Sequence, residues 1–396
     1  MQSFSPPIWI IVLLVGLSQL SETVYSPSLP EIAIELNTSI NNVEHTLTTY
    51  LVGFGIGVFF WGRLSDRIGR KPCLLGGLIL YIIGCISCYF SSDIYVLMLS
   101  RGLQAFGGSV GSVITQSITR DAFKGKELSK VFATVGTSLA LFPAIGPILG
   151  GFIAEHLQWN NIFLFLSIFA AVLTIFVVIK LPETHKKNNL KTFSTFEVLS
   201  QLARDPHVIK CAIIVGAGNG IIFSYFAEGS FYLMKALELT SIQYGMTFLL
   251  ISLATLLGGM TSKRLSNTHK QTEIIKYGIR IVLASTLIFS ALILLNQFFQ
   301  PIDKKILISI TVLSQMFTQF GLSMTMSNTL SISLMNYNWC TGTASSIFGL
   351  FYYFLVSLFN YGGRAAQWYF ASDATVFFKH INTYVKIKKK LIKLFA

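Results

Sequence analysis

Several charged side chains of this sequence stand inside long apolar stretches, where charges are rare. Glu22 lies inside the first apolar run, Arg101 lies in the fourth, and Glu228 lies in a run that begins near residue 208. A charge at membrane depth must face a bundle interior or a cavity and find partners there. A carboxylate in such a place can exchange a proton with its surroundings. We therefore predict that Glu22 is the leading proton or cation site and Glu228 a second one, whereas Glu44, at the start of its apolar run, belongs to the interface.

The amino-acid composition indicates whether these residues lie in water or in a membrane. The chain has 396 residues, of which 53% are hydrophobic and 12% are charged, with a mean hydropathy of +0.63. Soluble domains carry about 25% charged residues. Because large soluble chains need a polar surface, one globular core cannot absorb this deficit. The composition excludes a soluble enzyme, a disordered chain and a disulfide scaffold, and it predicts a polytopic helical membrane protein.

Apolar segments of membrane-spanning length follow one another along the chain, since about 20 apolar residues cross a bilayer as one helix. Six precede a polar stretch and five clear ones follow it, at approximately 8–26, 43–62, 73–90, 95–118, 130–154 and 161–181, then 208–233, 243–262, 277–297, 305–328 and 343–362. We predict an all-α chain in four parts: an N-terminal half (1–181), a central loop (182–207), a C-terminal half (208–362) and an atypical segment (363–396).

The basic residues predict the orientation of the chain. The net charge is +13, but the Lys and Arg residues form short clusters between apolar runs, which argues against nucleic-acid binding. They gather after the even-numbered spans: Arg63, Arg67, Arg70, Lys71, Arg120, Lys124, Lys126, Lys186, Lys187, Lys191, Arg204, Lys263, Arg264 and Lys270. Cytoplasmic loops carry the excess of Lys and Arg. We expect the N-terminus and the central loop to be cytoplasmic.

The C-terminal segment allows two interpretations. Residues 365–385 are long enough to cross the membrane, and crossing would return the lysine-rich end of the chain to the cytoplasm. The segment also contains Asp373, Lys379 and His380, and each buried charge costs about 2.5–3.5 kcal/mol. It is either a weak or degenerate twelfth span or an amphipathic segment on the membrane surface.

A specific motif joins the second and third spans. Residues 62–71 read GRLSDRIGRK, and the glycines permit a tight turn between two helices. The string resembles the signature loop of the major facilitator superfamily. The resemblance implies the major facilitator fold, which has two pseudo-symmetric six-helix halves. It also implies that residues of this loop have a functional role. These residues are Gly62, Asp66, Arg67, Gly69 and Arg70.

Two further spans carry motif-like strings. Arg101-Gly102-Leu103-Gln104 is similar to the superfamily's Arg-x-x-Gln-Gly motif, with Gly and Gln out of the usual order, and the resemblance implies a part for Arg101 in proton transfer. In the fifth span a proline kinks the helix and glycines allow close helix approach. This string resembles the antiporter motif of drug:proton exchangers, which implies control of proton leak and exchange direction. Its residues are Gly136, Gly146, Pro147, Gly150 and Gly151.

The end of the first span adds a subfamily resemblance. Residues 25–30 read YSPSLP after an acid, as in the Bcr/CflA drug-resistance subfamily. The acid there commonly stands two residues before the Tyr, where this chain has Thr23, whereas Glu22 stands three before. One residue is about 100° on a helix, so Glu22 faces a different direction. The resemblance covers approximately residues 8–362.

The resemblance implies a bacterial inner-membrane transporter that works as a monomer. We expect a central cavity lined by spans one, four, seven and ten, with Tyr25, Gln116, Asn219, Tyr225, Gln315 and Gln319 as candidate contacts. The sequence shows no nucleotide-binding, metal or enzyme constellation, so we expect the proton gradient, and no cofactor, to drive export of drugs or amphiphilic small molecules by alternating access. A dedicated metabolite or siderophore exporter, or a non-transporting or C-terminally decayed chain, are the alternatives.

Overall fold

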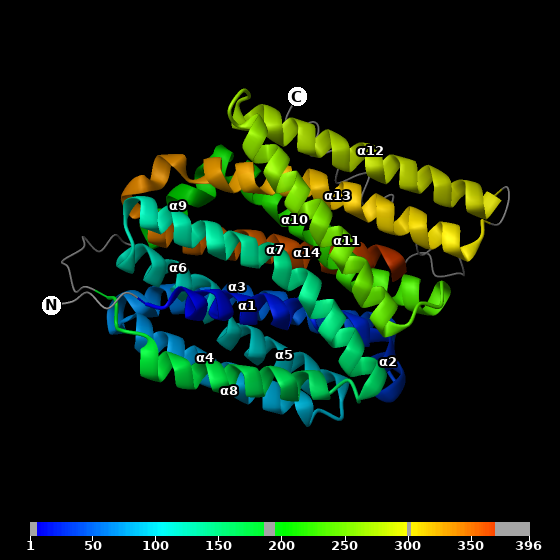
Figure 1. The fold of residues 1–396 in the computed structure, drawn as a ribbon, viewed down its shortest axis with the longest axis horizontal. Coiled ribbons are helices and arrows are strands. Elements are labelled where there is room, and N and C mark those ends of the chain that lie inside the picture. Colours follow the sequence, from blue (N-terminus) through cyan, green and yellow to red (C-terminus); the bar gives the residue numbers. More distant parts are fainter. Residues whose placement is uncertain (1–5, 186–194, 299–301, 369–396) are drawn as a thin grey trace.

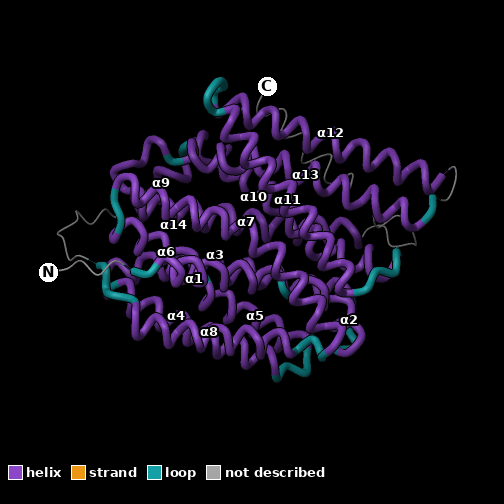
Figure 2. Tube along the Cα trace, in the orientation of Figure 1, coloured by secondary structure: helices purple, strands orange, loops and turns teal. Residues whose placement is uncertain are grey.

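The computed structural model describes residues 6–185, 195–298 and 302–368, and within these ranges the regular elements are all helical (Figure 1, Figure 2). A helix satisfies every backbone polar group within its own segment, which an apolar span requires in lipid. The first group of helices is α1 (Ile8–Thr23), η1 (Ser26–Ser28), α2 (Leu29–Glu35), α3 (Ile40–Ile68), α4 (Arg70–Tyr89), α5 (Ile94–Gly108), α6 (Val110–Ala122), α7 (Gly125–His156) and α8 (Asn161–Lys180). The remaining helices are α9 (Thr195–Arg204), α10 (Pro206–Ser230), η2 (Phe231–Ala236), α11 (Ser241–Leu265), α12 (Gln271–Phe298), α13 (Lys304–Ser333), η3 (Met335–Cys340) and α14 (Thr341–Trp368).

Eight helical segments in the described part of the chain are long and apolar enough to cross a membrane. The fourth predicted span is divided at Ser109 into α5 and α6, so neither piece reaches that length alone. α7 and α14 also contain apolar stretches, Leu141–His156 and Thr343–Leu358 among the described residues. The fold is therefore a polytopic helical membrane protein. The predicted twelfth span lies outside the described residues beyond Trp368.

Helix starts are set by local capping. Ser39, Asp93, Asp205 and Asp303 each accept a backbone hydrogen bond from the first turn of the helix that follows. Thr240 forms a reciprocal capping box with the third residue of α11. Such caps satisfy N–H groups that the helix itself leaves unpaired. Short polar connections between the spans are thus sufficient to define where each one begins.

The helices form two groups that meet along two seams. Within the first group α4 packs against α5 and α8, and α1 packs against α7; within the second group α12 packs against α13 and α10 against α14. The seams between the groups are α3 with α14 and α7 with α11. In Figure 1 the blue-to-cyan helices and the yellow helices lie on opposite sides of the bundle. Any cavity between these groups is bordered by residues of both.

The predicted central loop contains a helix. α9 packs against α10 and α14, and its Val198 and Leu202 are fully buried in a cluster with Ile347. The second part of the predicted central loop (182–207) is thus helical, because its apolar residues recur at helical spacing and pack against α10 and α14. Residues 186–194 lie outside the described part.

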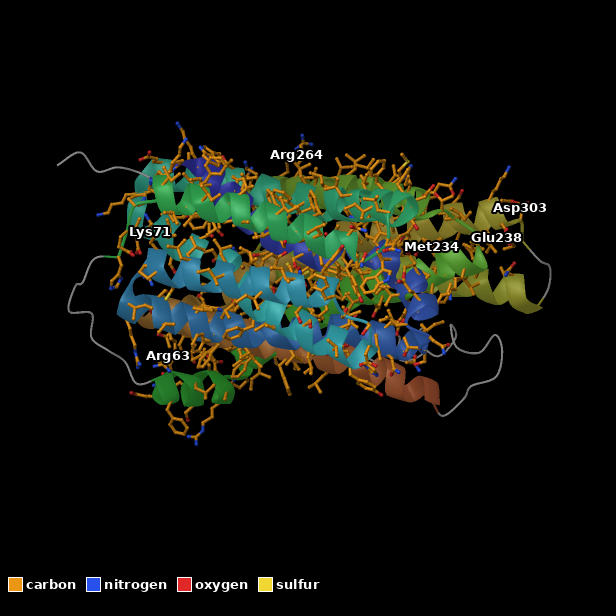
Figure 3. All side chains as sticks on the ribbon, turned by 90° about the horizontal axis from the view of Figure 1, so that it is seen from below. Arg63, Lys71, Met234, Glu238, Arg264 and Asp303 are labelled. Atoms are coloured by element: carbon orange, nitrogen blue, oxygen red, sulfur yellow. The ribbon has the colours of Figure 1, made fainter. Side chains whose placement is uncertain are left out.

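Charged residues distinguish the two ends of the bundle. Figure 3 shows Arg63 and Lys71 at one end and Glu238 and Asp303 at the other. We call the first the signature-turn end, because the chain turns there at Gly69 between α3 and α4. We call the second the opposite end. There Lys304 and Glu238 form an ion pair of 2.6 Å.

Candidate functional site

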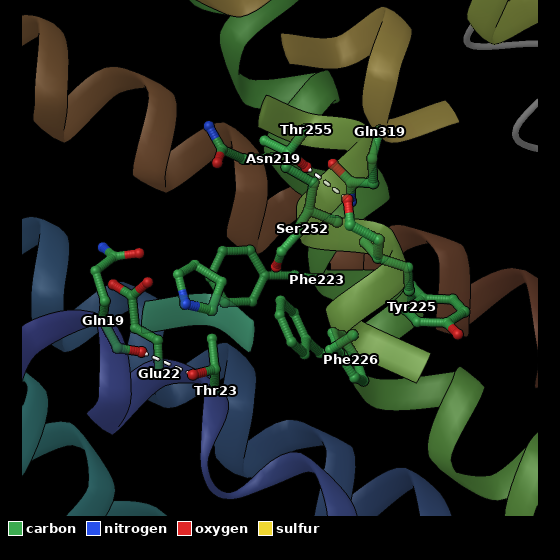
Figure 4. Close-up of a pocket in the computed structure, with 14 residues that line it drawn as sticks. Gln19, Glu22, Thr23, Asn219, Phe223, Tyr225, Phe226, Ser252, Thr255 and Gln319 are labelled. Carbon is green, nitrogen blue, oxygen red and sulfur yellow. Dashed lines mark hydrogen bonds between the residues drawn. The ribbon is translucent and has the colours of Figure 1, made fainter. Parts of the chain in front are cut away.

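A cavity of about 200 Å³ lies between the two groups of helices (Figure 4). Its walls come from α1, α7, α10, α11 and α13. The lining residues are Gln19, Glu22, Thr23, Pro143, Asn219, Ile222, Phe223, Tyr225, Phe226, Phe248, Ile251, Ser252, Thr255 and Gln319. Enclosed, mostly apolar sites with a few polar groups are the usual form of a small-molecule site. This cavity is the candidate functional site.

The structure places some of the predicted cavity contacts in this site and others elsewhere. Asn219, Tyr225 and Gln319 line it, as predicted. Tyr25 is instead buried beside Arg101, and Gln116 is exposed. The half-buried Gln315 is outside the lining as well.

The predicted set of cavity helices was also wrong in part. The fourth span does not reach this cavity, and α7 and α11, the fifth and eighth spans, contribute in its place. The close approach of α7 to α11 along their seam brings these two helices to the cavity wall.

Glu22 provides the one carboxylate among the lining residues. It is the second-to-last residue of α1, where it is only 6% exposed. Its Oε1 accepts no hydrogen bond from the described residues. In Figure 4 its side chain and that of Gln19 lie at the left of the view, and the rings of Phe226 and Tyr225 lie to the right. A buried carboxylate with free accepting capacity can bind a proton or a cationic group.

The part of the cavity wall formed by α10 and α11 is aromatic, and of its rings only Tyr225 was predicted as a cavity contact. The rings of Phe226 and Phe248 are stacked, with centroids 5.0 Å apart and an interplanar angle of 5°. Phe223 lies 6.0 Å from Phe226, and Tyr225 lies 5.4 Å from Phe248. Aromatic faces carry negative potential and attract both apolar groups and cations. Phe223 and Phe226 stand three residues apart, which is the only signal in the sequence that they share a helix face.

Arg101 lies inside the first group of helices and is fully buried. Its guanidinium carbon is 4.5 Å from the ring centroid of Tyr25 and 4.2 Å from that of Tyr50, so it is held between two aromatic faces. Nη1 donates to the Gln104 side chain at 2.6 Å and to the Ser21 carbonyl at 3.4 Å. No carboxylate of the described residues forms an ion pair with it. Arg101 thus contacts α1 at Ser21, the residue that precedes Glu22.

The other two membrane-depth carboxylates do not join this site. Glu228 is half-buried near the end of α10 and is not part of the cavity lining. Glu44, which we expected at the interface, is 2% exposed within α3.

The signature motif forms a charged cluster rather than a loop. Residues 62–68 are helical and end α3, so only Gly69 makes the turn. Arg70 pairs with Asp66 at 2.5 Å and with Asp121, at the end of α6, at 3.0 Å. Its Nη1 also donates to Ser65 at 2.8 Å. Arg70, in α4, thus links its own helix to α3 through Asp66 and to α6 through Asp121. The other predicted arginine, Arg67, is exposed on α3.

Glu183 completes this cluster, although the sequence analysis did not single it out. Its carboxylate accepts hydrogen bonds from the backbone N–H groups of Arg70 and Lys71, both at 3.0 Å, and from that of His185 at 2.7 Å. Partial burial alone would raise the pKa of Glu183, but these N–H donors hold it below its usual value. Gly69 has φ of 106°, and a Cβ there would press on the Glu183 carboxylate. Glycine is therefore required at this turn.

The antiporter-like motif packs α7 onto two other helices. A Cβ added to Gly146 would collide with the Thr23 side chain at the end of α1, and one added to Gly150 would collide with the backbone of Val24, the residue that follows α1. Gly151 lies equally close to the Ser241 carbonyl of α11. α7 also contains Pro143 and Pro147, and it changes direction along its length in Figure 1. Gly136 is on the same helix. The motif thus sets helix-to-helix distances at the cavity and at one seam.

This combination defines a class of protein. Membrane-length helices in two groups, with a cavity between them, a buried carboxylate on its wall and charged turns at one end, are the parts of a multi-pass membrane transporter. Within the described residues, no group of His, Cys, Asp and Glu side chains is arranged to hold a metal ion.

The chain belongs to the Major Facilitator Superfamily, which matches residues 11–360. An uncharacterized transporter of Rickettsia bellii is 35% identical over 89% of this chain and 87% of its own. A bicyclomycin resistance protein homolog of Haemophilus influenzae is 30% identical over 57% of this chain and 58% of its own. Multidrug resistance protein D of Escherichia coli is 26% identical over 67% of this chain and 68% of its own. These relatives confirm the resemblance to Bcr/CflA-type transporters.

Proposed function

We propose that this chain exports small amphiphilic molecules in exchange for protons, by alternating access of one central cavity. The observation that carries the proposal is the cavity itself, where the carboxylate of Glu22 faces the aromatic wall of Phe226 and Phe248. A proton and a cationic or neutral amphiphile would compete for this space, and the rings would hold the apolar part of the substrate. The resistance proteins among the relatives support an export role.

The remaining features take supporting parts in this mechanism. Arg101 positions α1 next to Glu22 through the Ser21 carbonyl. The cluster around Arg70 ties α3, α4 and α6 together as one moving unit. Rocking of the two groups about the α3–α14 and α7–α11 seams would expose the cavity to either end in turn.

The proposal includes an orientation and a location. The signature-turn end, with Arg63 and Lys71, would face the bacterial cytoplasm, because cytoplasmic ends carry the excess of basic residues. The protein would lie in the inner membrane, act as a monomer and use the proton gradient without a cofactor. Glu228, which we predicted as a second proton site, is not among the residues that line the cavity, so Glu22 carries the proton in this proposal.

Proton release from energised inside-out vesicles tests the proposal. A pH-sensitive dye reports release while single-ring aromatic amines, larger drug cations and hydroxamate or carboxylate metabolites are added one at a time. We expect amines to trigger release in the wild type and in Glu44→Gln, whose carboxylate is buried outside the cavity. We expect no release in Glu22→Gln, since the amide cannot ionise.

Folding of each variant is checked by size-exclusion chromatography in detergent. Normal proton release from Glu22→Gln would contradict the assignment of the proton site. A response only to the hydroxamate or carboxylate compounds would show a dedicated metabolite exporter instead of a drug exporter.

A further inference from the structure

The two groups of helices are joined by buried hydrogen bonds at the opposite end of the cavity from the signature turn. Ser26, in η1, is fully buried, and its Oγ donates to the carbonyl of Phe226 at the end of α10. The same Oγ lies 2.9 Å from the hydroxyl of Tyr244 in α11. The Tyr244 hydroxyl also lies 3.3 Å from the Tyr225 carbonyl. Three elements that belong to different groups thus share one small polar cluster.

A second contact lies at the same end. Glu155, in the last turn of α7, accepts a hydrogen bond of 3.1 Å from the backbone N–H of Ile242, in the first turn of α11. The carboxylate meets the positive end of the α11 dipole, which strengthens the bond. Gly151 lets the two helices approach at this point, because a Cβ there would collide with Ser241. This end is therefore closed by polar bonds on two sides.

The Ser26 cluster is directly connected to the candidate site. Ser26 follows Glu22 by four residues, so the two are about one turn apart along the chain. Phe226 has two parts in the structure, since its ring lines the cavity and its carbonyl accepts the bond from Ser26. Whatever moves Glu22 and Phe226 apart must therefore stretch this cluster.

We propose that Ser26 and Tyr244 form a latch that holds the cavity closed at this end and sets the balance between the two access states. The inference rests on the proposed function, because it assumes alternating access. A hydrogen bond between two buried groups lowers the free energy only of the state that makes it. The latch bonds join η1 to α10 and α11, so they are made only while this end is closed.

Thiol labelling of the cavity tests the latch without any need for transport. The five native cysteines are replaced, and Ser252→Cys on the cavity wall becomes the reporter. A membrane-impermeant methanethiosulfonate reagent is added to intact cells and, separately, to inside-out vesicles. We expect Ser26→Ala to increase the labelling rate in intact cells about fivefold and to lower it in vesicles. Tyr244→Phe should act in the same direction.

Ser28→Ala is the matched control. Ser28 lies in the same short helix and is fully buried, but its Oγ makes no hydrogen bond to the described residues. Equal labelling rates for the Ser26 and Ser28 variants, with Tyr244→Phe unchanged as well, would overturn the latch. The expected labelling pattern in a protein that releases no protons with any compound would support the latch and count against the proposed function. The two inferences therefore fail separately.

Discussion

Gly150→Ala is the substitution whose effect can be worked out most directly from the packing. An ideal Cβ on Gly150 would lie 2.8 Å from the carbonyl carbon of Val24 and closer still to its oxygen. Ordinary carbon contacts need about 3.5 Å, so α1 and α7 must separate by at least about 0.7 Å. The obstacle is backbone, which cannot rotate away as a side chain can. Overpacking of this kind costs about 1–3 kcal/mol.

Alanine also has a higher helix propensity than glycine, by about 1 kcal/mol, which offsets part of this cost. Gly76→Ala in α4 separates the two effects, because a Cβ there would meet only the Trp61 ring at 3.7 Å. We expect Gly150→Ala to be less stable than Gly76→Ala by about 1–3 kcal/mol. Thermal unfolding of both variants in the same detergent measures the difference.

Proton release from vesicles adds a functional measurement. Because Val24 follows Glu22 on the same helix end, the displaced helix should also reduce substrate-triggered release in Gly150→Ala but not in Gly76→Ala. A Gly150→Ala protein that melts at or above the temperature of Gly76→Ala would refute the packing argument.

Two further predictions concern the charged cluster at the signature turn. Asp66→Asn and Asp121→Asn both remove a partner of the same Arg70 guanidinium, so their effects on the free energy of unfolding should not add. A double-mutant cycle should show a coupling of at least about 0.5 kcal/mol between them. Strict additivity would mean that the two ion pairs act independently. Glu183→Gln should cost about 0.3–1 kcal/mol near neutral pH, where the wild-type carboxylate is ionised at the start of α4. Because the folded pKa of Glu183 lies below its unfolded value, this advantage is complete above about pH 4.3 and disappears as the pH falls through the folded pKa. Melting curves of both proteins at a series of pH values should converge at acidic pH, and a constant difference would show that the carboxylate charge has no part in it.

Local patterns were sufficient for much of this protein. Long apolar runs predict spanning helices because lipid leaves a single chain segment no other way to pair its backbone. The signature motif identifies the turn at Gly69, since a positive φ is a local requirement that glycine meets. Arg101 was expected inside the bundle because its charge cannot face lipid, and the structure confirms that it is buried. The weak twelfth span stays a prediction.

The faces of the helices were decided by the tertiary structure alone. The spans are apolar on all sides, so periodicity does not say which polar residue looks inward; Asn219 lines the cavity, whereas Gln116 is exposed. Contacts between distant parts of the chain were equally hidden. Ser26 and Phe226 are separated by 200 residues, and the carboxylate of Glu183 reaches a turn 113 residues earlier. Sequence determined which segments enter the membrane, because burial in lipid is a property of each segment; the site depends on how those segments pack against one another.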